Sequence, residues 1–194
     1  LTHQSLYVAF PLKHSPNEFL LIWTTTPWTL TSNVAVAVHP HMTYAKLRLN
    51  GRVFYAAKSL LDRFLPARYE ILGELAGRDL EGWTYQGPFD CLTAAQDEAL
   101  STAHRVILWE DVSDQEGTGL VHIAPGCGKE DFELGKRSGL PSIAPLDEYG
   151  VFKEGFGHLT GRKASNCTEL ICQDLESRGF LFKKESYVHR YPVC

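Results

Sequence analysis

The chain has 194 residues, of which 44% are hydrophobic and 22% are charged, and its formal net charge is −4. This composition is typical of a globular protein with a sizeable core, and no apolar run approaches the ~18 residues that cross a bilayer. The acidic balance argues against a surface that binds nucleic acid by its own charge, so a nucleic-acid substrate would need contacts from elsewhere. We expect a cytoplasmic protein with no membrane partner.

Both ends of the chain predict a segment cut from a larger protein. The sequence begins L-T-H-Q-S-L-Y-V-A-F, without a starting Met or a signal peptide, and stops at H-R-Y-P-V-C without a closing element. We expect residues 1–194 to form a single domain, with both termini as cut points.

The first half of the chain predicts mostly strands, from alternating or apolar patterns. The expected strands are residues 5–10, 18–24, 34–38, 43–49 and 52–57. The last two flank Asn50 and Gly51, a strong signal for a two-residue hairpin turn. A short amphipathic helix is expected over 58–65, before Pro66, whereas residues 69–100 give no clear element.

The second half predicts further strands with longer helices between them. Strands are expected at 104–110, 120–124 and 180–188, and helices at 129–137 and at 163–178, which would end at Gly179. Since strands dominate and the helices are few and peripheral, the sequence predicts a mixed α/β fold. Its core would be a β-barrel-like sheet rather than a doubly wound one.

The five cysteines predict free thiols rather than a disulfide framework or a metal site. They are odd in number, widely spaced and contain no C-x-x-C pair. They are Cys91, Cys127, Cys167, Cys172 and Cys194. Cys167 and Cys172 lie five residues apart on one predicted helix, so we expect one to be buried and the other exposed. We expect neither a metal nor a cofactor in this domain.

A strip of hydroxyls follows the second predicted strand, where W-T-T-T-P-W-T-L-T-S-N covers residues 23–33. Threonine hydroxyls both donate and accept hydrogen bonds, so Thr24–Thr26 could meet a sugar hydroxyl, a carbonyl or a water. Pro27 would hold Thr26 extended. From local physics alone the strip is also consistent with a hydroxyl-bonded turn and a helix cap at Thr31 or Ser32.

A second group of polar residues lies in G-T-G-L-V-H-I-A-P-G-C-G-K-E-D-F-E, residues 117–133. His122 is in mid-strand and faces the side opposite Val121 and Ile123, where a histidine is often only structural. The glycine loop behind it allows close approach of backbone, and Asp131 falls in the first turn of a helix. These features predict a small-molecule site.

Three sharper motifs can be compared with this stretch. It is not a phosphate-binding loop, because Ile123 and Glu130 stand where that motif needs Gly and Ser or Thr. It also lacks the third glycine of a dinucleotide fingerprint. A thiol hydrolase built from Cys127, His122 and Asp131 rests on proximity in sequence only.

Taken together, residues 23–40 and 117–135 closely resemble the inserted editing domain of isoleucyl-tRNA synthetases, and the chain's ending is similar to that family's return into the catalytic body. The resemblance extends over essentially the whole chain and is loose at about 60–105. The related valyl and leucyl insertions continue the threonine strip into Arg-Pro, whereas this chain continues T-T-T-P-W-T. The isoleucyl form is therefore favoured.

The resemblance implies a function, namely hydrolysis of valine wrongly attached to isoleucine tRNA, and of valyl-adenylate. Isoleucyl-tRNA synthetase is itself the standard example of an enzyme whose first site cannot reject an amino acid one methylene smaller, so a second site destroys the product. The implied partners are the 3′ end of aminoacylated tRNA(Ile), valine, valyl-adenylate and the remainder of the synthetase in cis.

The resemblance also implies roles for individual residues. Asp131 would pair with the substrate's α-ammonium, His122 would limit the size of the valine pocket, Trp28 would wall it, and the threonine strip would surround the ester and the ribose. Hydrolysis is expected to depend on Thr26, Asn33 and Asp131. Substrate binding is expected from Thr24, Thr25, Trp28, Thr29, His122, Ala124 and Asp131.

Two alternatives to this function stay open. The chain could be a catalytically silent module that binds the tRNA end, or it could be the editing domain of a valyl or leucyl enzyme. Cys127 also departs from the bulkier aromatic residue that many relatives carry, which leaves the pocket floor and adenylate binding undefined.

Overall fold

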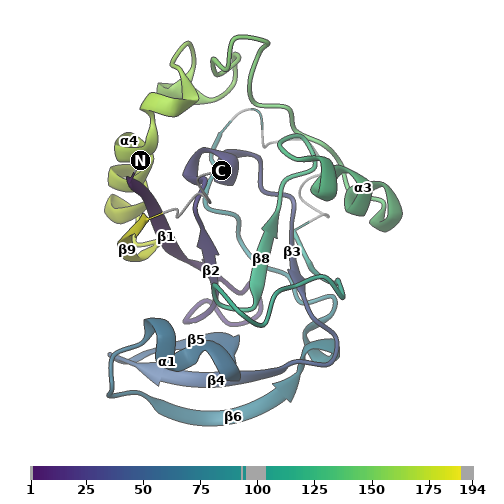
Figure 1. Ribbon diagram of the computed structural model, residues 1–194, viewed down its shortest axis with the longest axis vertical. Helices are drawn as coiled ribbons and strands as arrows, with labels where there is room; N and C mark the ends of the chain where they lie inside the picture. The colour runs from purple at the N-terminus through teal and green to yellow at the C-terminus, as the bar shows by residue number, and fades with distance from the viewer. Residues whose placement is uncertain (1, 93, 95–103, 189–194) are drawn as a thin grey trace, which may run out of the picture.

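The computed structural model describes residues 2–92, 94 and 104–188, which Figure 1 traces from purple at the N-terminus to yellow at the C-terminus. Strands form a six-stranded and a three-stranded sheet, and helices surround them. The predicted mixed α/β class is confirmed, although neither sheet closes on itself to form a barrel. Cys194 lies outside the described residues.

The predicted strands are all present, with some bounds shifted by a few residues. They are β1 (Thr2–Pro11), β2 (Glu18–Thr24), β3 (Ala35–Val38), β4 (Thr43–Leu49), β5 (Arg52–Ala57), β7 (Val106–Leu108), β8 (Leu120–Ile123) and β9 (Leu181–Val188). A further strand, β6 (Glu70–Ala76), lies in the stretch for which no clear element was predicted.

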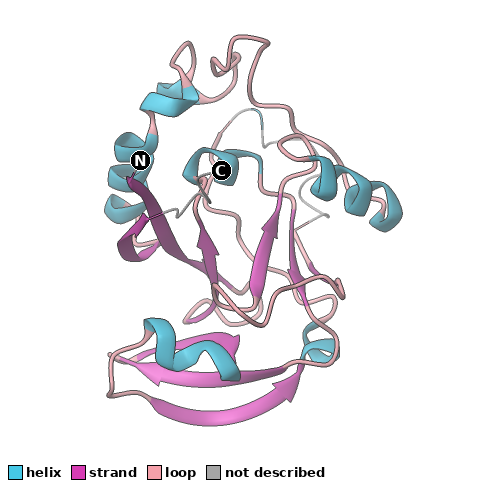
Figure 2. Ribbon diagram, in the orientation of Figure 1, coloured by secondary structure: helices cyan, strands magenta, loops and turns pink. Residues whose placement is uncertain are grey.

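The three predicted helices are also present, in part as 3-10 turns. The α-helices are α1 (Leu61–Phe64), α3 (Lys129–Ser138) and α4 (Thr168–Ser177), and the 3-10 helices are η1 (Pro27–Ser32), η2 (Lys58–Leu60), η3 (Gly77–Leu80), η5 (Gly157–Leu159) and η6 (Ala164–Asn166). Figure 2 shows α3 and α4 on opposite sides of the strands. No helix in the described part of the chain is long and apolar enough to cross a membrane.

The six-stranded sheet has the order β6-β4-β5-β2-β1-β9 and is antiparallel except between β2 and β5. The predicted hairpin joins β4 to β5. Asn50 and Gly51 at its turn have φ values of 50° and 78°, and two successive positive φ angles give the twist that two-residue hairpins favour. Asparagine and glycine therefore fix the register of this half of the sheet.

The three-stranded sheet, β7-β3-β8, explains the V-A-V-A-V pattern of the sequence. Strand β3 is central and buried on both faces: Val36 and Val38 join the main core, while Ala35 and Ala37 pack on the side where α3 inserts Leu134. The small alanines suit the approach of a helix. Strand β8 also lies beside β2 of the other sheet (Figure 1). The contact between these two strands, which are far apart in sequence, creates the site.

Two local expectations were wrong. Thr31 and Ser32 do not cap a helix, because both lie inside η1, which Pro27 begins. Cys167 and Cys172 are both buried, because Cys167 precedes α4 rather than lying within it and packs into the same core as Cys172.

Candidate functional site

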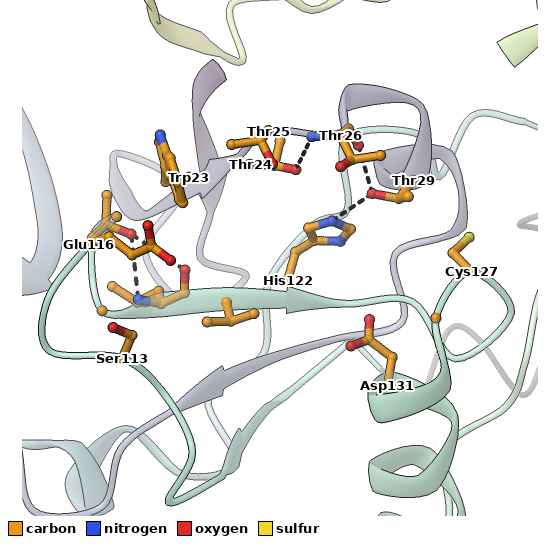
Figure 3. Close-up of a pocket in the computed structure, with 16 residues that line it drawn as sticks. Trp23, Thr24, Thr25, Thr26, Thr29, Ser113, Glu116, His122, Cys127 and Asp131 are labelled. Atoms are coloured by element: carbon orange, nitrogen blue, oxygen red, sulfur yellow. Dashed lines mark hydrogen bonds between the residues drawn. The ribbon is translucent and has the colours of Figure 1, made fainter. Parts of the chain in front are cut away.

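A cleft of about 320 Å³ lies between the end of β2, strand β8 and the start of α3 (Figure 3). This volume is at the lower end of the range of small-molecule sites. The cleft brings together two groups predicted from separate parts of the sequence. The lining residues are Trp23, Thr24, Thr25, Thr26, Thr29, Ser113, Glu116, Gly117, Thr118, Gly119, Leu120, Val121, His122, Cys127, Gly128 and Asp131.

The threonine strip forms one wall, and its own hydrogen bonds set its shape. Thr24 Oγ1 accepts the Thr26 N–H at 3.0 Å, which turns the chain at the end of β2. Thr29 Oγ1 donates to the Thr26 carbonyl at 2.8 Å and thereby fastens the first turn of η1. The hydroxyl-bonded turn expected from local physics is thus present, and it belongs to the wall of the cleft.

His122 projects from β8 into the opposite wall. It is paired with Val36 of β3 and faces away from Ile123, which packs with α3, as the strand alternation predicted. Its Nε2 lies 2.9 Å from Thr29 Oγ1, so the imidazole is tied to the threonine strip across the cleft. Burial lowers the pKa of His122 to about 4, and the ring is therefore neutral at pH 7.

Asp131 stands at the start of α3 and is anchored to the end of β8. Its Oδ2 accepts the Ala124 N–H at 2.8 Å. Burial raises the pKa of Asp131; the Ala124 N–H opposes this shift, whereas the charge of Glu130 adds to it. A half-buried carboxylate of this kind is stabilised by a cation, and it therefore suits an ammonium ligand.

Gly126 allows the loop between β8 and α3 to approach the backbone of residues 143–144 closely. A Cβ at this position would lie 1.8 Å from the Ile143 carbonyl oxygen. Any side chain would therefore push the loop away from residues 143–144 and would shift Asp131, which follows five residues later.

Cys127 lines the cleft but is not prepared as a nucleophile. Burial is the main cause that raises the pKa of its thiol to about 11, so the reactive thiolate is scarce at neutral pH. One ring nitrogen of His122, Nε2, is engaged by Thr29, and no hydrogen bond joins the Cys127 thiol to the other. The thiol hydrolase interpretation therefore lacks an activated nucleophile.

Three of the predicted site residues do not line the cleft. Trp28 packs against the main core, and Ala124 takes part only through its N–H. Asn33 is 5% exposed and both polar atoms of its amide are hydrogen-bonded: Nδ2 donates to the Ala35 carbonyl at 3.0 Å, and Oδ1 accepts the Tyr85 hydroxyl at 2.6 Å. These contacts place Asn33 behind the threonine strip, in a structural network.

The other end of the cleft was not predicted from the sequence. Figure 3 shows Trp23, Ser113 and Glu116 grouped away from Asp131, with His122 and the threonines between. The loop of residues 111–119 reaches this position because Gly117 has a φ of 74° and a Cβ there would lie 3.0 Å from the Trp23 ring. The two closely spaced glycines, 117 and 119, were the available signal.

The donor set of the cleft favours binding through hydrogen bonds rather than through a metal. Hydroxyls, one imidazole and two separated carboxylates line it. Among the described residues, no group of three or more His, Cys, Asp or Glu side chains is arranged to hold a metal ion.

Comparisons of the sequence with known proteins identify a consistent set of relatives. The isoleucine-tRNA ligase of Methanothermobacter thermautotrophicus is 46% identical over 190 residues, which are 98% of this chain. The chain spans only 18% of the length of that relative. No protein-family model matches the chain.

Comparisons with solved structures identify chains that share this fold. The crystal structure of GlLeuRS-CP1 has a TM-score of 0.73 at 15% identity and covers 95% of this chain and 100% of its own. The editing domain of the P. falciparum cytosolic leucyl-tRNA synthetase has a TM-score of 0.62 at 12% identity, with 85% and 78% covered. At such low identity these matches support the fold alone.

Proposed function

We propose, since this chain belongs to the isoleucine-tRNA ligase family and has the fold of synthetase editing domains, that its cleft hydrolyses valine wrongly esterified to tRNA(Ile). One observation carries the proposal: the cleft joins a wall of threonine hydroxyls to a wall bearing His122 and an anchored Asp131. The same cleft would accept valyl-adenylate. The 3′ end of the tRNA and the rest of the ligase are the proposed partners.

Asp131 is proposed to recognise the free α-ammonium of the aminoacyl group. One carboxylate oxygen is fixed by the Ala124 N–H, so the other can be directed at the ligand without rearrangement. An ion pair in this half-buried position is stronger than one in water. A peptidyl or other acylated amine lacks the charge and would be rejected.

His122 and Thr29 are proposed to set the size of the side-chain pocket. The imidazole is 9% exposed and hydrogen-bonded at 2.9 Å, so it cannot move aside at low cost to admit a larger side chain. Overlap with a close-packed wall is destabilising by ~1–3 kcal/mol for each added methylene group. The pocket would therefore accept valine and exclude isoleucine.

Hydrolysis itself is proposed to depend on a positioned water. An aminoacyl ester is already activated, so donors for the developing oxyanion and an oriented water are sufficient, without a covalent intermediate. Thr25 and Thr26 line the cleft beside the expected ester, and their hydroxyls supply both kinds of contact. Asn33 would act as a positioning residue, through the end of η1.

The test is deacylation of Val-tRNA(Ile) and of Ile-tRNA(Ile) by the chain, followed as loss of acid-precipitable amino acid. We expect faster loss of valine, with the preference reduced in His122→Ala. Glu70→Gln removes the exposed ion pair between Glu70 of β6 and Arg48 of β4, and it serves as the control that keeps wild-type rates. Equal or reversed rates for the two esters would contradict the proposed function, and no hydrolysis at all would favour a silent binding module.

A further inference from the structure

The Thr29 hydroxyl determines which nitrogen of His122 carries the proton. A hydroxyl has one hydrogen, and that of Thr29 is donated to the Thr26 carbonyl at 2.8 Å. The same oxygen lies 2.9 Å from His122 Nε2, so this contact requires the imidazole to be the donor. His122 is therefore in the Nε2–H form, and its Nδ1 is a bare hydrogen-bond acceptor.

This acceptor is buried and has no hydrogen-bond partner among the described residues. Burial keeps the ring neutral at pH 7, so protonation does not relieve the missing bond. Buried polar atoms are almost always paired, and one left unpaired destabilises the free protein. The residue itself lines the cleft, so a ligand seated there is the group best placed to complete this bond.

The surroundings of Nδ1 indicate the chemistry of that ligand. Figure 3 shows this ring nitrogen on the edge that faces Asp131 and Cys127, away from the Thr29 contact. Asp131 supplies a carboxyl group there, and its Oδ2 is already occupied by the Ala124 N–H. A neutral acceptor beside an anion fits a cation that carries several N–H donors.

We propose that His122 Nδ1 is the second acceptor for the α-ammonium of the substrate, with Asp131 as the first. The ammonium donates one N–H to Asp131 and another to Nδ1, so His122 recognises the amine as well as limiting the size of the side chain. The inference rests on the proposed function, because it concerns the same aminoacyl ligand. The attacking water is the other group that could use this acceptor.

Two substitutions separate the two nitrogens of His122. In His122→Asn a side-chain amide oxygen can occupy the position of Nδ1, whereas in His122→Gln the amide reaches the position of Nε2 and its contact with Thr29. The probes are the valyl amide of 3′-amino-3′-deoxyadenosine and its 3-methylbutanoyl counterpart, which differs by the missing amine. Their dissociation constants are measured by titration calorimetry with the chain.

We expect His122→Gln to weaken binding of the valyl probe about tenfold more than binding of its counterpart, as for one ordinary hydrogen bond. His122→Asn should retain most of the preference for the amine. If His122→Gln weakened binding of both probes equally, the ammonium role would be overturned. It would also be overturned if His122→Gln bound both probes like the wild type but deacylated Val-tRNA(Ile) more slowly, a result that would assign Nδ1 to the water. A wild-type chain that binds neither probe overturns the proposed function as well.

The tautomer is checked independently by ¹⁵N NMR of histidine-labelled chain. We expect Nδ1 of His122 to resonate as an unprotonated, pyridine-type nitrogen and to move upfield when the valyl probe, but not its counterpart, is added. A proton on Nδ1 in the free chain would contradict the inference, whatever the deacylation assay shows.

Discussion

Asn33 and His122 lie close to the same pair of strands, yet their side-chain polar atoms differ in whether they are hydrogen-bonded. Asn33 precedes β3, and both polar atoms of its side chain are paired within the protein. His122 lies on β8, opposite Val36 of β3, and one of its two nitrogens is unpaired. A buried side chain whose polar atoms are all paired holds the chain in place, whereas an unpaired buried acceptor is available to a ligand.

The network around Asn33 supports this distinction. His104 donates through Nε2 to the Asn33 carbonyl at 3.1 Å, and its Nδ1 lies 3.3 Å from Asp90 Oδ2. The Tyr85 hydroxyl completes the set. These contacts fix the junction between η1 and β3 from behind, so the threonine strip keeps its position in the cleft.

The largest expected effect is on stability, at Asn33. Asn33→Ala removes both side-chain bonds and leaves the Tyr85 hydroxyl and the Ala35 carbonyl buried and unpaired, so we expect a loss of about 4 kcal/mol in the free energy of unfolding. Tyr85→Phe removes one bond and should cost about half as much. Urea denaturation measures both. An Asn33→Ala chain of wild-type stability that has lost deacylation would reverse the comparison, by placing Asn33 in the chemistry.

The next effect is the pH dependence that His122 gives to stability. Its pKa is about 4 in the folded chain and 6.5 ordinarily, so below pH 6.5 the unfolded state takes up a proton that the folded state does not. The associated stability is complete above pH 6.5 and is lost as the pH falls toward 4, by about 3 kcal/mol.

His122→Asn should remove this component, so the unfolding free energy of the variant should fall less between pH 7 and 4 than that of the wild type. Urea titrations at several pH values measure the difference. Parallel curves for the two proteins would show that His122 is not buried in its neutral form.

A smaller effect, on activity rather than on stability, is expected at Asp131. Asp131→Asn keeps an oxygen for the Ala124 N–H but removes the charge, so we expect kcat/KM for valyl ester to fall by about 30-fold. The melting temperature should stay close to that of the wild type. Unchanged kcat/KM would exclude Asp131 from recognition of the ammonium.

The smallest effect sets the baseline for these comparisons. Arg48 and Glu70 form an ion pair at 3.0 Å whose side chains are 51% and 63% exposed. Glu70→Gln should therefore change the free energy of unfolding by less than ~0.5 kcal/mol. A larger change in urea denaturation would mean that surface electrostatics also contribute to the differences assigned to the buried groups.

The sequence predicted those features that depend on local pattern. Periodicity located most strands, the Asn50-Gly51 turn located the hairpin, and strand alternation gave the direction of His122. It did not predict the state of Asn33, because the partners that satisfy its amide include Tyr85, 52 residues away. The Glu116 end of the cleft was missed for a similar reason, since β2 and β8 become neighbours only in the folded chain.

The central claim is that the cleft between the threonine strip and Asp131 holds the aminoacyl group, while the Asn33 network only supports it. The most direct measurement is the dissociation constant of the valyl amide of 3′-amino-3′-deoxyadenosine for the wild type, Asp131→Asn and Tyr85→Phe, each under conditions where the chain is folded. We expect weaker binding to Asp131→Asn and wild-type binding to folded Tyr85→Phe. Wild-type affinity in Asp131→Asn, or weakening confined to Tyr85→Phe, would contradict it.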